Sequence, residues 1–593
     1  MQERIERAGV DRPRYGRALR LRLTVVVWTF AVVRPLCGQE PPSDAGNVAL
    51  SRRVESVLAT PEFQNGHWGI LVVDRKSGQT VFERNPDQLF APASVTKLFS
   101  TAAALVELGQ NHRFGTPMVR HGEIDSKGVL RGDLILLAQG DLCTGGRTGP
   151  DGTLLFRDDD HTYAGGNLDS QLTPTDPLAG LDHLAREVQA AGIREIAGEV
   201  VVDDRLFAPA LTTGSGPRRV SPIVINDNVV DILAQPAATA GAPAVVVFQP
   251  ATQFVTMDAQ VATVAAGQQP SLQVHAVGPH RIAVRGELPL GRPRTVKIHE
   301  VDDPASFARA LLIEALERRG VRVAVSPLGS NVTAGLPPPA EVAKLPKVAE
   351  YTSPPFSEFI KVTLKVSHNL YASTLPLLLA ARHGERTLDA GLRRQGEILK
   401  TLGVDPATIS FGGGAGGDRA DLATPRATVT LLRAMSNRPE FAAYDAALPV
   451  LGRDGTLAKA VSKDSPARGH AHAKTGTYFV ENKLTGTVVL TSKALAGYLE
   501  TAAGRSLIFA AFVNNVPLDA PKPNRSTSEA TAAAGRVLGK LCEALYADSG
   551  ASTDSPPRAA TTSQNARGSA HETGRAVPIQ GEPISKIVIR ERR

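Results

Sequence analysis

Cysteine and tryptophan are scarce in this chain of 593 residues, which holds three cysteines and two tryptophans. The cysteines are Cys37, Cys143 and Cys542, and no Cys-x-x-Cys pair or Cys/His cluster occurs, so this pattern does not argue for a bound metal. If Cys37 is removed with an N-terminal signal, one pair remains, about 400 residues apart in the chain. Whether that pair forms a disulfide stays open at this stage.

A charge excess of one sign is also missing from the body of the chain. The net charge is +7 and the isoelectric point is near 9.3, values that can indicate a nucleic-acid partner. However, residues 1–34 carry eight Arg against three acidic residues, and residues 549–593 carry seven basic against four acidic residues. Residues 35–548 are left with a net charge of −1. We therefore expect no nucleic-acid partner.

The apolar run near the N-terminus is short. Residues 23–33, LTVVVWTFAVV, follow an arginine-rich stretch and number eleven, too few to cross a bilayer comfortably. These proportions are typical of the apolar part of a secretory signal peptide. We predict that residues 1–38 are a signal peptide and that the protein is exported to the periplasm or the cell envelope. The cleavage site stays open, because Arg34 and Pro35 interrupt the region where small residues are expected.

An acidic run at residues 157–161, Arg-Asp-Asp-Asp-His, could imitate a set of metal ligands. A run of charges of this kind is more often a solvated loop. The sequence therefore predicts an exposed loop here and no metal site.

A serine and a lysine stand one helical turn apart in FAPASVTKLFSTAAALVELG, residues 90–109. Ser94 could cap a helix that begins there, with Lys97 as an ordinary surface residue. Alternatively, positions i and i+3 share a helix face, so the Ser94 hydroxyl and the Lys97 amine could meet. A lysine among apolar neighbours tends to lose its proton, and a neutral amine can accept the proton of a serine hydroxyl. The motif alone leaves both interpretations open.

Two strands and one helix are predicted around this motif. Residues 66–92 have the pattern of two strands joined by a turn at Lys76-Ser77-Gly78. The helix is expected to start near Ser94 and to end at Gly109, a plausible C-cap.

A long insertion follows. Residues 115 to about 345 hold short strand-like segments between Gly/Pro turns, with helical stretches at 178–191 and 304–320. A proline-rich linker at 335–346 closes this segment. We predict one or two inserted modules that are mainly β.

Helical patterning returns after residue 346 and leads to a glycine-rich loop at 411–425. Strand-like segments then precede a last helix, which is expected to end near residue 548. Residues 549–593 are rich in Ser, Thr, Ala and Arg without an apolar period, so we predict a disordered tail.

Two further polar motifs follow the first and offer groups that amide chemistry needs. Besides a nucleophile, attack on an amide carbonyl needs a proton donor for the leaving amine, donors for the oxyanion and a cation for an anionic substrate end. Ser367-His368-Asn369 lies between two predicted helices. Lys474-Thr475-Gly476-Thr477 lies at a predicted strand edge, where glycine lets a substrate backbone approach.

The sequence Ser-x-x-Lys, then Ser-x-Asn, then Lys-Thr-Gly resembles the signature of serine penicillin-recognising enzymes, which are penicillin-binding proteins and serine β-lactamases. The long segment between the first two motifs is similar to the D-alanyl-D-alanine carboxypeptidase/endopeptidase family, the class C low-molecular-mass penicillin-binding proteins. Residues 452–461, 473–477 and 495–501 also resemble stretches of that family. The resemblance covers roughly residues 50–545.

The chain departs from the family pattern in two loops. Residues 413–416 are Gly-Gly-Ala-Gly where the family commonly has Asp-Gly-Ser-Gly. Residues 140–142 are Gly-Asp-Leu where Gly-Asp-Pro is usual. These departures concern loop conformation and substrate fit and leave the three motifs intact.

The resemblance implies a role for each motif residue. Ser94 would attack and form the acyl-enzyme, and Lys97, neutral in the resting site, would take its proton. Ser367, helped by Lys474, would relay a proton to the departing D-alanine. Asn369 would hold the substrate amide, and Lys474 would also attract the terminal carboxylate.

The third motif is implied to complete the substrate site. Thr475 and Thr477, with Gly476 between them, would bind the carboxylate beside the motif lysine. The backbone N–H groups of Ser94 and Thr477 would form the oxyanion hole. His368 occupies the variable position of the second motif, and we interpret it as a bystander.

The fold implied by the resemblance is an α/β (α+β) penicillin-binding transpeptidase-like domain. It would consist of an antiparallel sheet flanked by helices and an all-helical subdomain. Residues 39–115 and 346–548 would form this discontinuous domain, with the mainly-β modules inserted at 116–345.

The function implied is a D-Ala-D-Ala carboxypeptidase/endopeptidase that acts on peptidoglycan stem peptides and is acylated by β-lactam antibiotics, without a metal or organic cofactor. One alternative is a serine β-lactamase, which would need a carboxylate for fast deacylation and a compact chain. Another is a non-catalytic protein that binds peptidoglycan or β-lactams, for which a lost motif residue would argue. Peripheral association with a membrane stays an open expectation.

Overall fold

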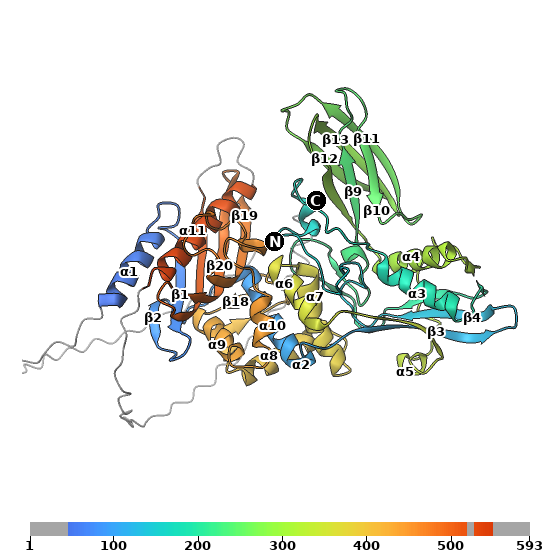
Figure 1. Cartoon of the computed structure of the whole chain (residues 1–593), viewed down its shortest axis with the longest axis horizontal. Helices are drawn as coiled ribbons and strands as arrows, with labels where there is room; N and C mark the ends of the chain where they lie inside the picture. The colour runs from blue at the N-terminus through green and yellow to red at the C-terminus, as the bar shows by residue number, and fades with distance from the viewer. Residues whose placement is uncertain (1–44, 519–526, 549–593) are drawn as a thin grey trace, which may run out of the picture. The chain divides into compact units, whose positions relative to one another are not determined.

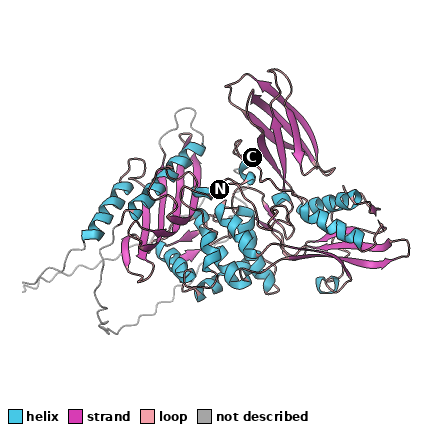
Figure 2. Ribbon diagram, in the orientation of Figure 1, coloured by secondary structure: helices cyan, strands magenta, loops and turns pink. Residues whose placement is uncertain are grey.

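The computed structural model describes residues 45–518 and 527–548. The predicted signal peptide at residues 1–38 and the predicted disordered tail at residues 549–593 lie outside the described residues. Within them, strands form several separate sheets and most helices gather beside the sheet at the left of Figure 1 (Figure 1 and Figure 2).

One antiparallel sheet of five strands joins both ends of the described chain. Its order is β19 (Ala471–Asn482), β20 (Thr487–Glu500), β21 (Ser506–Pro517), β1 (His67–Asp74) and β2 (Thr80–Arg84). The two strands predicted at 66–92 are therefore confirmed as β1 and β2. Strand β19, which carries the third motif, is an edge strand, as the sequence predicted.

The two faces of this sheet have different cores. Helices α1 (Ala45–Leu58) and α11 (Thr527–Tyr546) cover one face, where Val54, Leu495 and Leu541 belong to one buried apolar cluster. Ala494 and Ala496 belong instead to the cluster of the other helices. Because successive strand residues point to opposite faces, β20 contributes to both cores.

The second core is formed by a group of helices. These are α2 (Thr96–Leu108), α6 (Phe356–Lys365), α7 (Asn369–Arg382), α8 (Leu388–Thr401), α9 (Pro425–Met435) and α10 (Phe441–Ala446). Helix α2 is buried on nearly all sides and contacts α6, α7 and α8, and its buried residues are mostly apolar or small. Gly109 caps its C-terminus with φ +84°, as predicted.

The inserted segment contains a six-stranded mixed sheet. Its strands are β15 (Arg322–Val323), β5 (Glu195–Ile196), β4 (Val129–Leu137), β3 (Gly115–Ile124) and β16 (Lys347–Thr352), with β6 (Val200–Asp203) paired to β4. Helices α3 (Ala179–Ala190) and α4 (Pro304–Arg318) confirm the two predicted helical stretches and share a core with this sheet. Strand β16 pairs with β3, so residues 347–352 lie in the inserted sheet although the sequence analysis placed the boundary at 346.

Two sheets of three strands each complete the insertion. One has the order β10 (Val245–Gln249), β9 (Val229–Gln235) and β14 (Thr295–Glu300), and the other β11 (Thr256–Val264), β13 (Arg281–Pro289) and β12 (Ser271–Gly278). The short elements of the insertion are helix α5 (Pro339–Val342) and the strand pair β7 (Ala210–Leu211) with β8 (Arg219–Val220). A further pair, β17 (Ile409–Ser410) with β18 (Leu422–Ala423), lies outside the insertion, at the glycine-rich loop.

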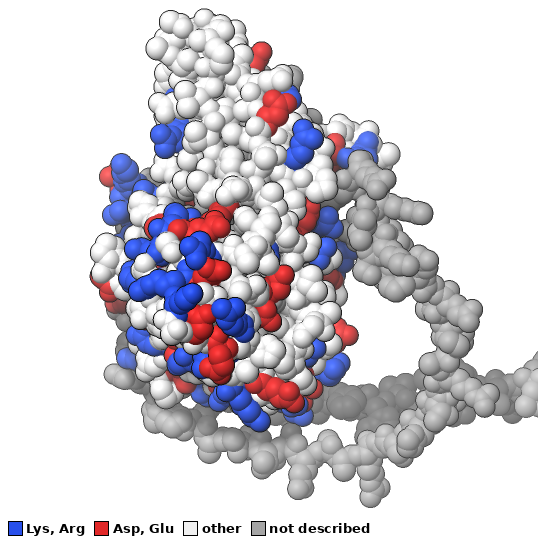
Figure 3. Space-filling view, turned by 90° about the vertical axis from the view of Figure 1, so that its right-hand side faces the viewer, with Lys and Arg blue, Asp and Glu red and all other residues white. Residues whose placement is uncertain are grey.

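On the face drawn in Figure 3, Lys and Arg side chains stand among Asp and Glu side chains, and the upper part carries few charges. Cys143 and Cys542 are free and buried in different apolar clusters, so no disulfide joins them. Among residues 45–518 and 527–548, no helix has both the length and the apolar character that a membrane-spanning segment needs.

Candidate active site

Ser94 lies in a short 3₁₀ turn that leads into α2. The turn η1 spans Ala93–Val95, and α2 follows at Thr96 with no side-chain capping bond. The Ser94 hydroxyl lies 2.9 Å from the Lys97 amine instead. The capping interpretation is therefore wrong, and the two side chains of the first motif meet as their spacing predicted.

Lys97 is fully buried beneath the nucleophile turn. Its amine also donates to the Asn369 side-chain oxygen at 2.7 Å and to the Ala415 carbonyl at 2.6 Å. Burial lowers the pKa of Lys97 to about 7, although the nearby Asp421 acts to raise it. Near neutral pH much of Lys97 is therefore uncharged. A neutral amine can donate to the two carbonyl oxygens and accept the proton of the Ser94 hydroxyl.

Ser367 joins α6 to α7 in a conformation that its neighbours must hold. Its φ is +63°, which is uncommon for a residue other than glycine. The Tyr163 hydroxyl donates to the Ser367 carbonyl at 2.9 Å. The Lys474 amine donates to the Ser367 hydroxyl oxygen at 2.9 Å. With this oxygen already receiving a hydrogen bond, the Ser367 O–H is free to donate toward a substrate.

Asn369 begins α7 and links the first two motifs. Its side-chain oxygen accepts the bond from Lys97, and its amide donates to the Ser215 carbonyl at 2.9 Å and the Ser215 hydroxyl at 3.1 Å. Ser215 is exposed and comes from the inserted segment. A substrate amide that engages the Asn369 amide would therefore take the place of Ser215.

Lys474 stands on β19 between the second motif and its own strand. It is fully buried, and besides Ser367 its amine contacts the Thr475 carbonyl at 2.8 Å. Burial first, and then the positive charges of Lys97 and Lys493, holds the pKa of Lys474 well below its usual range.

Gly476 and Thr477 complete the third motif beside the nucleophile. A Cβ on Gly476 would lie 2.3 Å from the Pro92 carbonyl oxygen, so only glycine lets β19 lie against η1. The Thr475 hydroxyl is bonded to the Thr456 hydroxyl at 2.8 Å. The Thr477 hydroxyl oxygen accepts a bond from Lys493 at 2.8 Å.

The glycine-rich loop at 411–425 backs the nucleophile turn despite its departure from the family pattern. Gly416 has φ +89°, and a Cβ there would lie 1.9 Å from the Ala93 carbonyl oxygen. The same loop supplies the Ala415 carbonyl to Lys97. Burial raises the pKa of Asp421, near the end of the loop, to about 7, although two backbone N–H groups act to lower it. The sequence analysis assigned no role to this loop, whose backbone fixes both members of the first motif.

The acidic run at 157–161 is not solvated throughout, so that prediction is wrong in part. Arg157, Asp158 and Asp159 are exposed, but Asp160 and His161 are buried. The reason is tertiary: the run ends in the 3₁₀ turn η2 (His161–Gly165), whose start is packed against the second motif and the β9 region.

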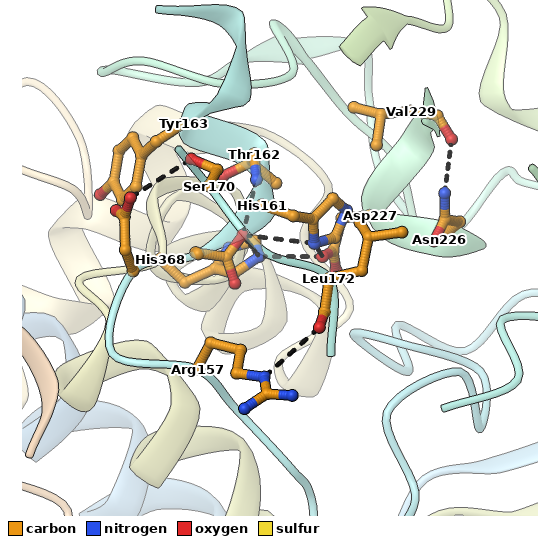
Figure 4. A network of polar contacts seen from close by, with 12 residues as sticks. Arg157, His161, Thr162, Tyr163, Ser170, Leu172, Asn226, Asp227, Val229 and His368 are labelled. Carbon is orange, nitrogen blue, oxygen red and sulfur yellow. Dashed lines mark hydrogen bonds and ion pairs between the residues drawn. The ribbon is translucent and has the colours of Figure 1, made fainter. Parts of the chain in front are cut away.

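Figure 4 shows the surroundings of this turn, where His161 lies beside Asp227 and His368. The rings of His161 and His368 both lie close to Asp160 and Asp227, with nitrogen–oxygen distances between 3.4 and 3.8 Å. Arg147 donates to Asp160 at 2.5 Å and also to Asp227. Burial alone would raise the pKa of Asp160, yet Arg147 and the two imidazoles lower it to about 2.

The sequence predicted no metal site in this run, yet the structure brings one possible ligand atom from each of Asp160, His161 and Asp227 within 4.8 Å of the others. However, the Arg147 guanidinium already provides these carboxylates with a positive partner. The network ties the inserted segment to the second motif through His368, which also accepts the Tyr371 N–H at 3.4 Å at the start of α7.

Lys493 is the main residue of this site that the sequence analysis missed. It lies on β20 directly opposite Thr477 and is almost completely buried. In the sequence Lys493 follows Thr491 and Ser492 and lies between two segments with strand-like patterns, so no local signal marked it. Tyr163, Ser215 and Asp421 were missed as well, and their positions depend on loops whose packing no local pattern specifies.

Comparison with known proteins extends over most of the chain. The profile of the D-Ala-D-Ala carboxypeptidase 3 (S13) family matches residues 50–535. A D-alanyl-D-alanine carboxypeptidase from Actinomadura sp. (strain R39) is 30% identical over 505 residues, which cover 80% of this chain and 85% of that protein. A penicillin-sensitive carboxypeptidase A from Dictyostelium discoideum is 24% identical over 76% of this chain and 83% of its own length.

The fold is also shared with a solved structure. Penicillin binding protein 4 (dacB) from Haemophilus influenzae aligns with a TM-score of 0.61 at 19% identity, covering 83% of this chain and 99% of that one. A second structure of that protein, in complex with a β-lactam, aligns with a TM-score of 0.58. The fold is therefore the α/β fold of penicillin-binding proteins. On the match of residues 50–535 and on the relative at 30% identity, the chain belongs to the S13 family of D-Ala-D-Ala carboxypeptidases, which are serine peptidases.

Proposed function

We propose that this protein hydrolyses the terminal D-Ala-D-Ala bond of peptidoglycan stem peptides through an acyl-enzyme on Ser94. The observation that carries the proposal is the 2.9 Å contact between the Ser94 hydroxyl and the fully buried Lys97 amine. A serine becomes a nucleophile when a neighbouring base takes its proton, and an amine with a pKa of about 7 is suited to that task.

The acylation step follows from these contacts. The Ser94 oxygen attacks the carbonyl carbon of the penultimate D-alanine while its proton moves to the Lys97 amine. The carbonyl oxygen becomes an oxyanion, which the backbone N–H groups of Ser94 and Thr477 would stabilise. The tetrahedral intermediate collapses when the bond to the terminal D-alanine breaks and its nitrogen takes a proton from Ser367. Lys474 replaces that proton through its hydrogen bond to Ser367.

Deacylation returns the enzyme to its starting state. A water molecule attacks the ester carbonyl and gives its proton to a neutral amine of the site. The ester bond breaks, and Ser94 recovers its proton as the shortened peptide leaves. The same steps with a β-lactam ring in place of the peptide bond give a covalent adduct, since the opened ring keeps the leaving nitrogen attached.

The remaining motif residues bind the substrate in this proposal. Asn369 holds the substrate amide in exchange for Ser215, and Thr475, Gly476 and Thr477 line the subsite of the terminal carboxylate. Cleavage of cross-links between stem peptides, which is endopeptidase action, would use the same groups. Export by residues 1–38 would bring the enzyme to its substrate.

The test is release of D-alanine from an acyl-D-Ala-D-Ala peptide by the wild-type protein and by Ser94→Ala. We expect turnover by the wild type and at least a thousandfold loss in the variant. Folded wild-type protein that releases no D-alanine but is labelled by a fluorescent penicillin would instead indicate a non-catalytic β-lactam-binding protein. Rapid hydrolysis of the antibiotic without peptide turnover would indicate a β-lactamase.

A further inference from the structure

Lys493 lies beside the third motif and belongs to none of the three motifs. Strands β19 and β20 pair Thr477 directly with Lys493, so their side chains stand next to each other on one face of the sheet. The Lys493 amine donates to the Thr477 hydroxyl oxygen at 2.8 Å. Lys493 is only 5% exposed, so the contact is held away from bulk water.

This hydrogen bond fixes what the Thr477 hydroxyl can do. A hydroxyl has one proton to donate and two lone pairs that accept. Because Lys493 occupies one lone pair, the O–H bond of Thr477 points elsewhere and remains available as a donor. Thr475 differs, since its hydroxyl already donates to Thr456. Of the two threonines, Thr477 is the one prepared to donate to an incoming oxygen.

The lysines around Thr477 favour an anionic oxygen as the acceptor of this hydrogen bond. Lys97, Lys474 and Lys493 are all buried, and within residues 45–518 and 527–548 none of them forms an ion pair with a carboxylate. Lys474 and Lys493 are close enough that the charge of Lys493 acts to lower the pKa of Lys474. Burial disfavours the charged form of a lysine that has no counter-charge, and a bound carboxylate would restore the charged form by supplying one.

We infer that Lys493 is a specificity-determining residue for a free C-terminal carboxylate on the substrate. It acts by holding the Thr477 hydroxyl as a donor and by adding a second positive charge to that of Lys474. The inference rests on the proposed function, since it assigns the substrate end that this site receives. Peptides whose C-terminus is an amide should gain little from Lys493.

The test compares an acyl-D-Ala-D-Ala peptide with its C-terminal amide in the wild-type protein and three variants. Lys493→Met removes the charge and the donor but keeps a side chain of similar length in the buried site. Lys493→Arg keeps the charge. Lys483→Met is the matched control, because Lys483 is an exposed lysine that follows β19 and forms an ion pair with Glu481.

We expect Lys493→Met to lower kcat/KM for the free acid at least tenfold, mainly through KM, and to leave kcat/KM for the amide within about twofold. Lys493→Arg should recover part of the loss, and Lys483→Met should match the wild type. An equal loss on both peptides, or no loss on the acid, would overturn the inference.

A second measurement needs no turnover and keeps this result separate from the proposed function. Calorimetry on Ser94→Ala should show tighter binding of the free acid than of the amide. Adding Lys493→Met should remove that preference while the thermal melting temperature stays near that of Ser94→Ala. If the acid and the amide bind alike, the role of Lys493 is refuted even where Ser94-dependent release of D-alanine stands. If the wild type releases no D-alanine, the proposed function fails while this binding result still decides on Lys493.

Discussion

Two buried polar clusters contact the second motif, and they differ in whether their charged groups form ion pairs. In the lysine cluster (Lys97, Lys474 and Lys493) no amine forms an ion pair with a carboxylate of the described residues, although the charge of Asp421 acts on Lys97. The acid–histidine network (Arg147, Asp160, His161, Asp227 and His368) pairs its carboxylates with a guanidinium and two imidazoles.

We interpret the lysine cluster as a ligand-binding site and the acid–histidine network as a structural element. Paired buried charges satisfy one another, and removing one partner leaves the other uncompensated. Unpaired buried lysines have depressed pKa values, which favour proton transfer, and they keep a site where a bound anion would stabilise the protonated form. The lysine cluster is thus expected to control rates and substrate choice, and the acid–histidine network to control stability.

The largest effect is expected at the centre of the lysine cluster. Lys97→Met removes the proton acceptor of Ser94, so the rate of labelling by a fluorescent penicillin should fall by a factor of about 10² to 10⁴. The melting temperature should change little, because removal of the buried amine offsets the loss of its hydrogen bonds to Asn369 and Ala415. Labelling at the wild-type rate would contradict the role of Lys97.

The reverse pattern is expected in the acid–histidine network. Arg147→Met leaves Asp160 and Asp227 buried without their guanidinium, so urea unfolding should show a loss of about 3–5 kcal/mol. Arg131→Met is the matched control, because Arg131 forms an exposed ion pair with Asp125 at 2.9 Å. That control should lose less than about 1 kcal/mol. Equal losses of unfolding free energy in the two variants would show that burial does not make the ion pairs of Arg147 more important for stability than that of Arg131.

A smaller effect follows from the pKa of Lys97, which is about 7 in the folded protein. Acylation needs the neutral amine, and its share grows as the pH rises through the pKa. The labelling rate should therefore rise with pH and be about tenfold lower at pH 6 than on the plateau above pH 8.

Asp421 provides the control for that profile. Its negative charge raises the pKa of Lys97, so Asp421→Asn should move the midpoint of the profile to lower pH. A profile that falls with rising pH, or a midpoint that moves upward in the variant, would argue against Lys97 as the base.

The smallest effect is expected for His368, which we interpreted from the sequence as a bystander in catalysis. His368→Asn keeps a good N-cap for α7 but removes the imidazole from Asp160 and Asp227. We expect a stability loss of about 1–2 kcal/mol and a labelling rate within threefold of the wild type. A large loss of labelling in a protein of unchanged stability would give His368 a direct part in the reaction.

The sequence was most informative where chemistry requires a residue type at a fixed spacing. The meeting of Ser94 with Lys97 follows from one helical turn, and Gly476 follows from the close approach of a strand edge. Strands β1 and β2 and helices α3 and α4 could be predicted because their apolar periods are regular.

The rest could not be predicted, because it depends on contacts between distant segments. The burial of Asp160 and His161 comes from Arg147 and Asp227, which no local pattern links to them. Lys493 becomes part of the site only through its register opposite Thr477. The sequence alone does not indicate which buried cluster a charged strand residue belongs to.

The central claim is that Ser94 is an acylated nucleophile, and intact-protein mass spectrometry with benzylpenicillin tests it most directly. We predict that the mass of the wild-type protein rises by that of one antibiotic molecule and that the Ser94→Ala protein keeps its mass. Folded wild-type protein that gains no mass while the antibiotic stays intact would contradict the account.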